Sequence, residues 1–97
     1  MMGEKRNSGA FHAVVLGRVQ GVGFRYSACA RAEELRLGGW VRNLDDGSVE
    51  VVAEGAVERL ALFEEWLRRG PTGAYVREVR LDRIEPRGRY PRFTIEF

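Results

Sequence analysis

The chain of 97 residues contains one cysteine, Cys29, and one histidine, His12. One cysteine cannot form an internal disulfide, and so few cysteines and histidines cannot supply the usual ligand set of a zinc site. The pattern of apolar residues predicts a helix around Cys29 and a strand around His12. We therefore expect helix packing for the thiol, a structural or surface role for the imidazole, and neither a metal site nor a cofactor.

Long apolar runs are missing too, because no stretch of the sequence approaches the roughly 18 apolar residues of a membrane-spanning helix. The first residues, MMGEKRNSG, lack the apolar segment of a secretory signal. We expect a soluble, cytoplasmic protein with no membrane partner and with residues 1–9 as a flexible leader. Residues 10–97 are enough for a single domain with one core, since 44% of the chain is hydrophobic.

The chain also lacks a strong excess of either charge. Sixteen basic and 14 acidic residues are interleaved along the sequence and leave a net charge of +2, which does not require a nucleic-acid partner. An RNA-binding module with a similar order of elements would carry an aromatic-rich Lys/Arg-Gly-Phe-Gly-Phe segment, whereas residues 48–54 read SVEVVAE. We expect no nucleic acid to bind.

What the chain does contain is a regular succession of strand and helix patterns. Valine-rich or alternating runs predict strands, and apolar residues every three to four positions predict two amphipathic helices. Gly38 and Gly39 are expected to end the first helix in a left-handed conformation, and a slip in alternation between Val76 and Val79 indicates a β-bulge. The predicted elements are a strand at 11–16, a helix at 24–37, a hairpin of strands at 40–42 and 49–54, a helix at 56–69, and strands at 76–84 and 93–97.

This order, β-α-β-β-α-β with one more strand at the C-terminus, is typical of the split βαβ arrangement. Right-handed crossovers would place both helices on one face of the sheet, with the first and third strands central. The predicted fold class is therefore α+β, a mostly antiparallel sheet covered by two helices.

A glycine-rich segment, GRVQGVGFR at 17–25, joins the first strand to the first helix. Gly17, Gly21 and Gly23 allow a positive φ and let backbone N–H groups converge, and the positive end of the helix adds its unpaired donors, so the segment can form a nest for an anion. Arg25 can engage two oxygens of one phosphate. On glycine spacing alone, a plain turn with a solvent-facing arginine explains the segment equally well. Walker A and Rossmann loops do not fit its pattern.

A second polar position, Asn43, stands just before the turn of the predicted hairpin. Its amide offers both a donor and an acceptor, although an asparagine at a strand end is also a common turn residue. The adjacent Asp45 and Asp46 point apart in a turn, so we interpret them as turn residues and not as paired catalytic carboxylates. Trp40 and Trp66 are expected to pack in the core or at its rim.

Two long segments resemble one family throughout. VLGRVQGVGFR at 15–25 and GWVRNLDDGSVEVVAEG at 39–55 are similar to the two signature segments of the acylphosphatases, in the same order and on the expected elements. The resemblance covers residues 11–97 and includes GPTGAYVREV after the second helix. It implies a ferredoxin-like α/β sandwich and the hydrolysis of acyl phosphates to a carboxylate and inorganic phosphate.

By matching positions, the resemblance implies that Arg25 binds the phosphate and that Asn43 holds the attacking water. The phosphate-binding residues would be Val19, Gln20, Gly21, Val22, Gly23, Phe24 and Arg25. Inorganic phosphate would be both product and inhibitor, and one complete site suggests a monomer. The alternative is a non-catalytic phosphate- or carbamoyl-phosphate-binding domain of the same fold. Because the sequence ends at Phe97, we expect a free-standing enzyme.

Overall fold

A computed structural model describes residues 7–97 of the chain. Within them, strands and helices follow one another in the predicted order. The elements are β1 (Ser8–Arg18), α2 (Phe24–Glu34), β2 (Gly38–Asn43), β3 (Val49–Ala56), α3 (Val57–Arg69), β4 (Tyr75–Ile84) and β5 (Phe93–Glu96). Neither helix in this range is long and apolar enough to cross a membrane.

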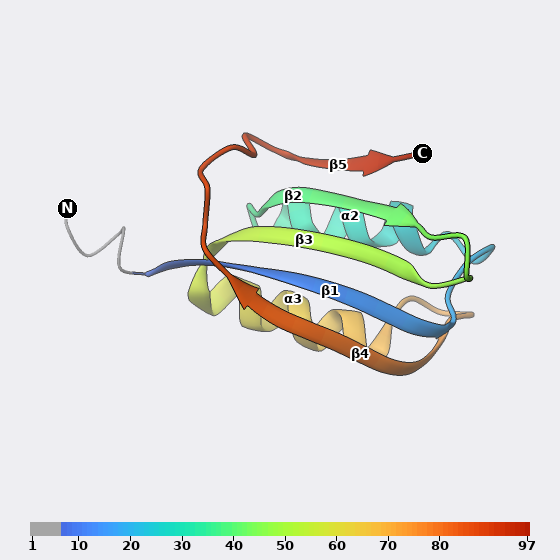
Figure 1. Cartoon of the computed structure of the whole chain (residues 1–97). Coiled ribbons are helices and arrows are strands. Elements are labelled where there is room, and N and C mark those ends of the chain that lie inside the picture. The colour runs from blue at the N-terminus through green and yellow to red at the C-terminus, as the bar shows by residue number, and fades with distance from the viewer. Residues whose placement is uncertain (1–6) are drawn as a thin grey trace.

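The strands form one sheet in the order β4-β1-β3-β2-β5, with β1 and β3 in its interior (Figure 1). β1 pairs antiparallel with β3 and β4, and β2 pairs antiparallel with β3, whereas β5 joins β2 in parallel. Both helices cover the same face of the sheet (Figure 1), as right-handed crossovers require. The predicted ferredoxin-like α+β fold is confirmed.

The core lies between the sheet and the two helices. Phe11, on the inner face of β1, is fully buried, and Phe63 of α3 stacks on it with ring centroids 6.2 Å apart. Trp66 of α3 meets Phe24, the first residue of α2, edge to face at 5.6 Å. This contact confirms the packing role expected of Trp66, and it fixes the N-terminal end of α2 against α3.

β1 is longer than the sequence predicts. It begins at Ser8, which pairs with Ala56 of β3, so the last two residues of the expected leader belong to the sheet. Asn7, just before the strand, accepts a hydrogen bond from Val57 N at 2.6 Å through its carbonyl oxygen, and residues 1–6 lie outside the described residues. The sequence pattern marks only the apolar part of a strand, whereas backbone pairing with β3 continues past it.

The β-bulge predicted between Val76 and Val79 is present where β1 meets β4. Leu16 pairs with Glu78 but Gly17 pairs with Val76, so the register shifts at this point. A Cβ on Gly17 would lie 2.2 Å from the carbonyl oxygen of Tyr75. Gly17 is therefore required by the close approach of two strands, not by the anion nest to which the sequence pattern assigns it.

α2 ends earlier than predicted, at Glu34. The left-handed residue after it is Arg36, with a φ of 58°, while Gly38 and Gly39 begin β2. The sheet explains the glycine at position 39, because a Cβ there would lie 1.9 Å from the carbonyl oxygen of Val52. The glycines thus belong to the sheet and do not end the helix.

Arg36 occupies the place that glycine usually takes in a Schellman motif. The motif's two hydrogen bonds run from Leu37 N to Ala32 O at 2.9 Å and from Arg36 N to Glu33 O at 3.0 Å. The left-handed conformation costs a residue with a Cβ about 1–2 kcal/mol, so glycine would relieve this strain. Glycine also gives the unfolded chain more conformational entropy, which offsets part of the stabilisation. We expect Arg36→Gly to raise the free energy of unfolding by about 0.5–1 kcal/mol.

Urea denaturation measures this change in stability. Arg36→Ala is the matched control, because it removes the same exposed side chain but keeps the Cβ, and it should bring no gain. Equal stabilities for the glycine and alanine variants would contradict the proposed strain at this position.

The segment between β4 and β5 runs from one edge of the sheet to the other (Figure 1). Glu54, near the end of β3, binds it, because its carboxylate accepts hydrogen bonds from the backbone N–H groups of Arg87 at 2.9 Å and Gly88 at 2.5 Å. β5 then lies beside β2, with Gly39 opposite Phe93. This path brings the C-terminal end of β5 to the start of α2.

Candidate active site

The loop between β1 and α2 contains two left-handed glycines, the second of them at the start of the helix. Gly21 and Gly23 have φ values of 77° and 75°, and the space that a Cβ would occupy is open at both. Glycine is therefore required at both positions for its backbone conformation, and not because a Cβ would clash. Gly23 is the N-cap of α2, whose first turn closes with Ser27 N donating to Gly23 O at 3.0 Å. The N–H groups of residues 24–26 come before this bond and have no carbonyl partner within the helix.

α2 provides no negative group at this end. No side chain caps its N-terminus and its first turn contains no Asp or Glu, whereas α3 has Glu58 in its first turn. The positive end of the helix dipole is therefore not neutralised by the helix itself. An anion at this point would accept hydrogen bonds from the loop and from the first turn together.

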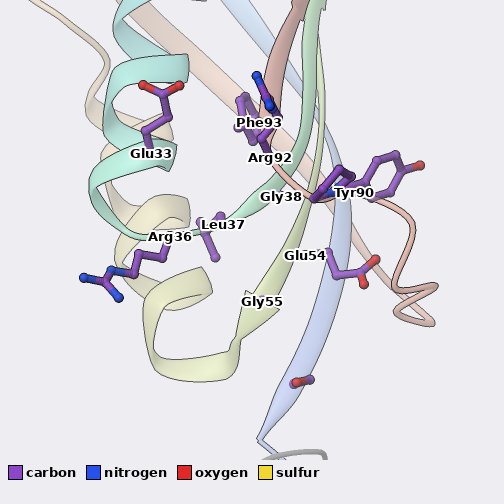
Figure 2. Close-up of a pocket in the computed structure, with 11 residues that line it drawn as sticks. Glu33, Arg36, Leu37, Gly38, Glu54, Gly55, Tyr90, Arg92 and Phe93 are labelled. Atoms are coloured by element: carbon purple, nitrogen blue, oxygen red, sulfur yellow. The ribbon is translucent and has the colours of Figure 1, made fainter.

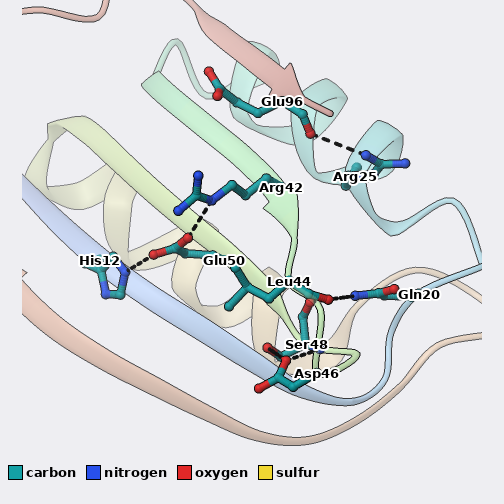
Figure 3. A network of polar contacts seen from close by, with 9 residues as sticks. All are labelled: His12, Gln20, Arg25, Arg42, Leu44, Asp46, Ser48, Glu50 and Glu96. Carbon is teal, nitrogen blue, oxygen red and sulfur yellow. Dashed lines mark hydrogen bonds and ion pairs between the residues drawn. The ribbon is translucent and has the colours of Figure 1, made fainter.

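Arg25 projects from the first turn of α2, and the C-terminal residues hold its guanidinium group. Nη1 donates to the carbonyl oxygen of Glu96 at 3.3 Å (Figure 3), and Cζ lies 4.7 Å from the centre of the Phe97 ring. The ring stabilises the cation through its negative face. Within residues 7–97 the guanidinium makes this single hydrogen bond, so most of its five N–H donors are available to an anion.

A cavity of about 110 Å³ lies at the start of α2. This volume equals that of about three to four water molecules, so it suits a group of the size of a phosphate. Val19, Gln20, Gly21, Gly23, Phe24, Arg25, Tyr26 and Asn43 line the cavity. The cavity therefore brings the glycine-rich loop and Arg25 together with Asn43, which lies at the end of β2.

Two residues differ from the set that the sequence predicts. Val22 is predicted to bind phosphate but does not line the cavity, because its side chain packs against the core. Tyr26 lines the cavity, with 61% of its surface exposed, and the sequence reasoning missed it. The available signal was its place directly after Arg25 in the first turn of α2.

Asn43 is the last residue of β2 and pairs with Val49 of β3. It is half-buried, and its side-chain amide makes no hydrogen bond within the described part of the chain. The turn that follows is closed instead by Asp46, whose carboxylate accepts hydrogen bonds from Ser48 N at 2.9 Å and Ser48 Oγ at 2.5 Å. These bonds lower the pKa of Asp46. Asp46 is thus a turn residue, as expected, whereas Asn43 lines the cavity and makes no side-chain hydrogen bond to the turn in the described residues.

The single histidine and the single cysteine have partners away from the cavity. His12 Nε2 lies 2.7 Å from one oxygen of Glu50, and Arg42 Nε donates to the other at 2.7 Å (Figure 3). Burial raises the pKa of Glu50, but these bonds outweigh it and the net shift is downward. Cys29 donates to the carbonyl oxygen of Phe93 at 3.6 Å, and burial raises the pKa of its thiol.

Residues 7–97 bring together no group of three His, Cys, Asp or Glu side chains that could hold a metal ion.

Trp40, on the sheet, lies under the guanidinium of Arg42, with the Cζ atom of Arg42 5.0 Å from the centre of the tryptophan ring. The packing role expected of this tryptophan is therefore found at the sheet surface.

A larger cavity, of about 430 Å³, lies at the opposite end of β2 (Figure 2). Gly38, Glu54 and Tyr90 are among its lining residues. The carboxylate of Glu54 already accepts two backbone hydrogen bonds, and the guanidinium of Arg36 points away from the other labelled side chains (Figure 2). Size alone therefore does not identify the site, because the smaller cavity is the one lined by the start of α2, Arg25 and Asn43.

Comparison with known proteins agrees with this geometry. Residues 11–95 match the family model "Acylphosphatase". An acylphosphatase of Pseudomonas aeruginosa is 53% identical over 77 residues, which cover 79% of this chain and 85% of that protein. One of Bordetella parapertussis is 48% identical over 83 residues, covering 86% and 88%. The structure of an acylphosphatase from Coxiella burnetii has a TM-score of 0.92 and 41% identity, and the match covers 99% of this chain and all of that one.

The fold and these matches first define a class, the hydrolases that act on small phosphorylated molecules. Within that class the chain belongs to the acylphosphatase family. Its reaction is the hydrolysis of acyl phosphates to a carboxylate and inorganic phosphate. The chain matches most of the length of these relatives, so the alternative of a non-catalytic binding domain is not favoured.

Proposed function

We propose that the loop at 19–25 and the Arg25 guanidinium bind the phosphoryl group of the acyl phosphate, while the Asn43 amide holds the attacking water. The observation that supports this division is the 110 Å³ cavity, where the loop, Arg25 and Asn43 meet although the loop and the asparagine lie on separate elements. An amide can accept a hydrogen bond from water and donate one to it, which orients its lone pair.

The chemistry of the substrate suits this set of groups. Phosphoryl transfer passes through a loose transition state with charge on the equatorial oxygens, so positioning and electrostatic stabilisation supply most of the catalysis. Water forms the new P–O bond as the bond to the acyl oxygen breaks, and the carboxylate leaves with the electron pair. It is a stable anion and needs no general acid. The proton of the water passes to an oxygen of the phosphate itself.

The product explains the expected inhibition. Inorganic phosphate presents the same oxygens to the cradle as the substrate does, so it should compete with the acyl phosphate for the same site. The backbone N–H groups and Arg25 supply the positive charge that the phosphate requires, so we expect no need for a metal ion. A monomeric state, a cytoplasmic location and the absence of a nucleic-acid partner stay predictions.

Hydrolysis of benzoyl phosphate by the purified chain tests the proposal. We expect turnover at the same rate with and without a chelator, and competitive inhibition by inorganic phosphate. Phenyl phosphate is the matched control substrate, because its ester linkage has a much poorer leaving group, and it should not be turned over measurably. Activity that is lost in the chelator would contradict the metal-independent chemistry, and an inactive chain would contradict the function.

A further inference from the structure

Gln20 makes an unusual contact for a residue of an anion-binding loop. Its side-chain Nε2 donates to the carbonyl oxygens of Leu44 and Ser48, each at 2.8 Å, in the turn between β2 and β3 (Figure 3). Both partners are carbonyl oxygens, which accept but cannot donate, so only one orientation of the amide satisfies them. Both N–H groups of the side chain are therefore committed to the hairpin.

The two carbonyl groups lie on the turn side of Asn43, one on each arm of the hairpin. Leu44 follows Asn43 directly, and Ser48 precedes Val49, the residue that pairs with Asn43 across the ladder. Leu44 N also donates to Ser48 O at 2.9 Å and closes the hairpin at this point. The amide of Gln20 thus binds the turn just beyond Asn43, on both arms of the hairpin.

In the part of the chain that the structure describes, no other side-chain hydrogen bond joins the loop at 19–23 to the turn at 44–48. The loop and α2 position the phosphate, whereas the hairpin positions Asn43. The distance between the phosphate and the water therefore depends on how firmly these two elements are held together. The bonds of Gln20 are the polar link between them.

We propose that Gln20 is a positioning residue for hydrolysis, which holds the Asn43 amide and its water in line with the bound phosphate. The proposal rests on the proposed function of the cavity. The phosphate is bound by backbone N–H groups and by Arg25, and neither depends on the amide of Gln20. Loss of this amide should therefore lower the rate of the chemical step without weakening phosphate binding.

The test is Gln20→Met, which keeps the length of the side chain and removes both donors. A misplacement of about 1 Å can cost about 10²-fold in rate, so we expect kcat for benzoyl phosphate to fall by about 10- to 10²-fold. KM and the inhibition constant of inorganic phosphate should stay within about twofold. Gln20→Asn, whose amide is one methylene too short to reach the hairpin, should give the same split and is the second variant if the first does not fold.

A double-mutant cycle with Asn43→Ala separates positioning from a general loss of order. Because Gln20 acts through Asn43, Gln20→Met should lower kcat no further once Asn43 is alanine. Glu54→Ala is the matched structural control, since this side chain also makes two hydrogen bonds to backbone groups, at the far end of β3. It should lower the melting temperature and leave kcat unchanged well below that temperature.

Three results would overturn the proposal. The first is an unchanged kcat in Gln20→Met, and the second is a parallel loss of phosphate affinity. The third is that Gln20→Met lowers kcat by the same factor in the wild type and in the Asn43→Ala variant. An inactive wild-type chain would instead overturn the proposed function, and this inference with it. An active wild type with an unaffected Gln20→Met variant would overturn the role of Gln20 alone.

Discussion

Arg25→Ala is expected to lower kcat/KM for benzoyl phosphate by about 10²–10³-fold or more, because it removes a preorganised donor at the developing charge. Arg25 lines the cavity at the start of α2, and most N–H donors of its guanidinium are available. In the proposed site the same group also contacts the ground-state phosphate, so the inhibition constant of inorganic phosphate should rise as well. Steady-state kinetics with phosphate as a competitive inhibitor measures both effects.

Two further variants test the reason for this loss. Arg25→Lys keeps the charge but not the planar fork, so it should recover only part of the activity. Arg18→Ala removes an exposed arginine at the end of β1 that does not line the cavity, and its effect should stay within about twofold because solvent screens it. Phosphate inhibition that is unchanged in Arg25→Ala would contradict the role of Arg25 in binding.

Asn43→Ala is expected to abolish most turnover, by about 10²-fold or more, while the inhibition constant of phosphate stays close to that of the wild type. The reason is that, in the proposed site, the Asn43 amide contacts the water and not the phosphate. Loss of kcat without loss of phosphate affinity is therefore the signature of a water-positioning residue. Asp45→Ala, an exposed change in the same turn, is the control and should leave both constants unaltered.

The outcome that contradicts this role is equally definite. If Asn43→Ala turned over benzoyl phosphate normally, another group would have to hold the water. If phosphate affinity fell together with kcat, Asn43 would belong to the phosphate-binding set. The contrast between Arg25→Ala and Asn43→Ala is thus more informative than either variant alone.

The order of strands and helices could be predicted from the sequence because the apolar periodicities that report it are local. The ends of the elements could not. α2 stops at Glu34 because the left-handed conformation falls on Arg36, which no propensity favours. Gly38 and Gly39 are required instead by close contact with the backbone of Tyr90 and of Val52. Such contacts join residues far apart in the sequence.

The site divides in the same way. Arg25 and Asn43 are predicted as site residues because they stand in the two segments that resemble the acylphosphatase signatures, whereas the residue pattern alone leaves a plain turn open at each. The two carbonyl groups that Gln20 contacts are 24 and 28 residues away, and the contact of Arg25 with Glu96 spans 71 residues. The local sequence pattern does not show which residues so far apart come into contact. The sequence therefore predicts a phosphate-binding loop but not the hydrogen bonds that hold the loop, the hairpin and Arg25 in place.

The most direct test of the account is to locate bound phosphate by titrating the isotopically labelled chain with inorganic phosphate and following its NMR signals. We predict that the backbone amides of Gly21, Gly23 and Arg25 and the side-chain amide of Asn43 shift along one common saturation curve. The signals of Gly38 and Tyr90, at the larger cavity, should stay in place. Saturable shifts at Gly38 and Tyr90 with a silent loop would contradict the account.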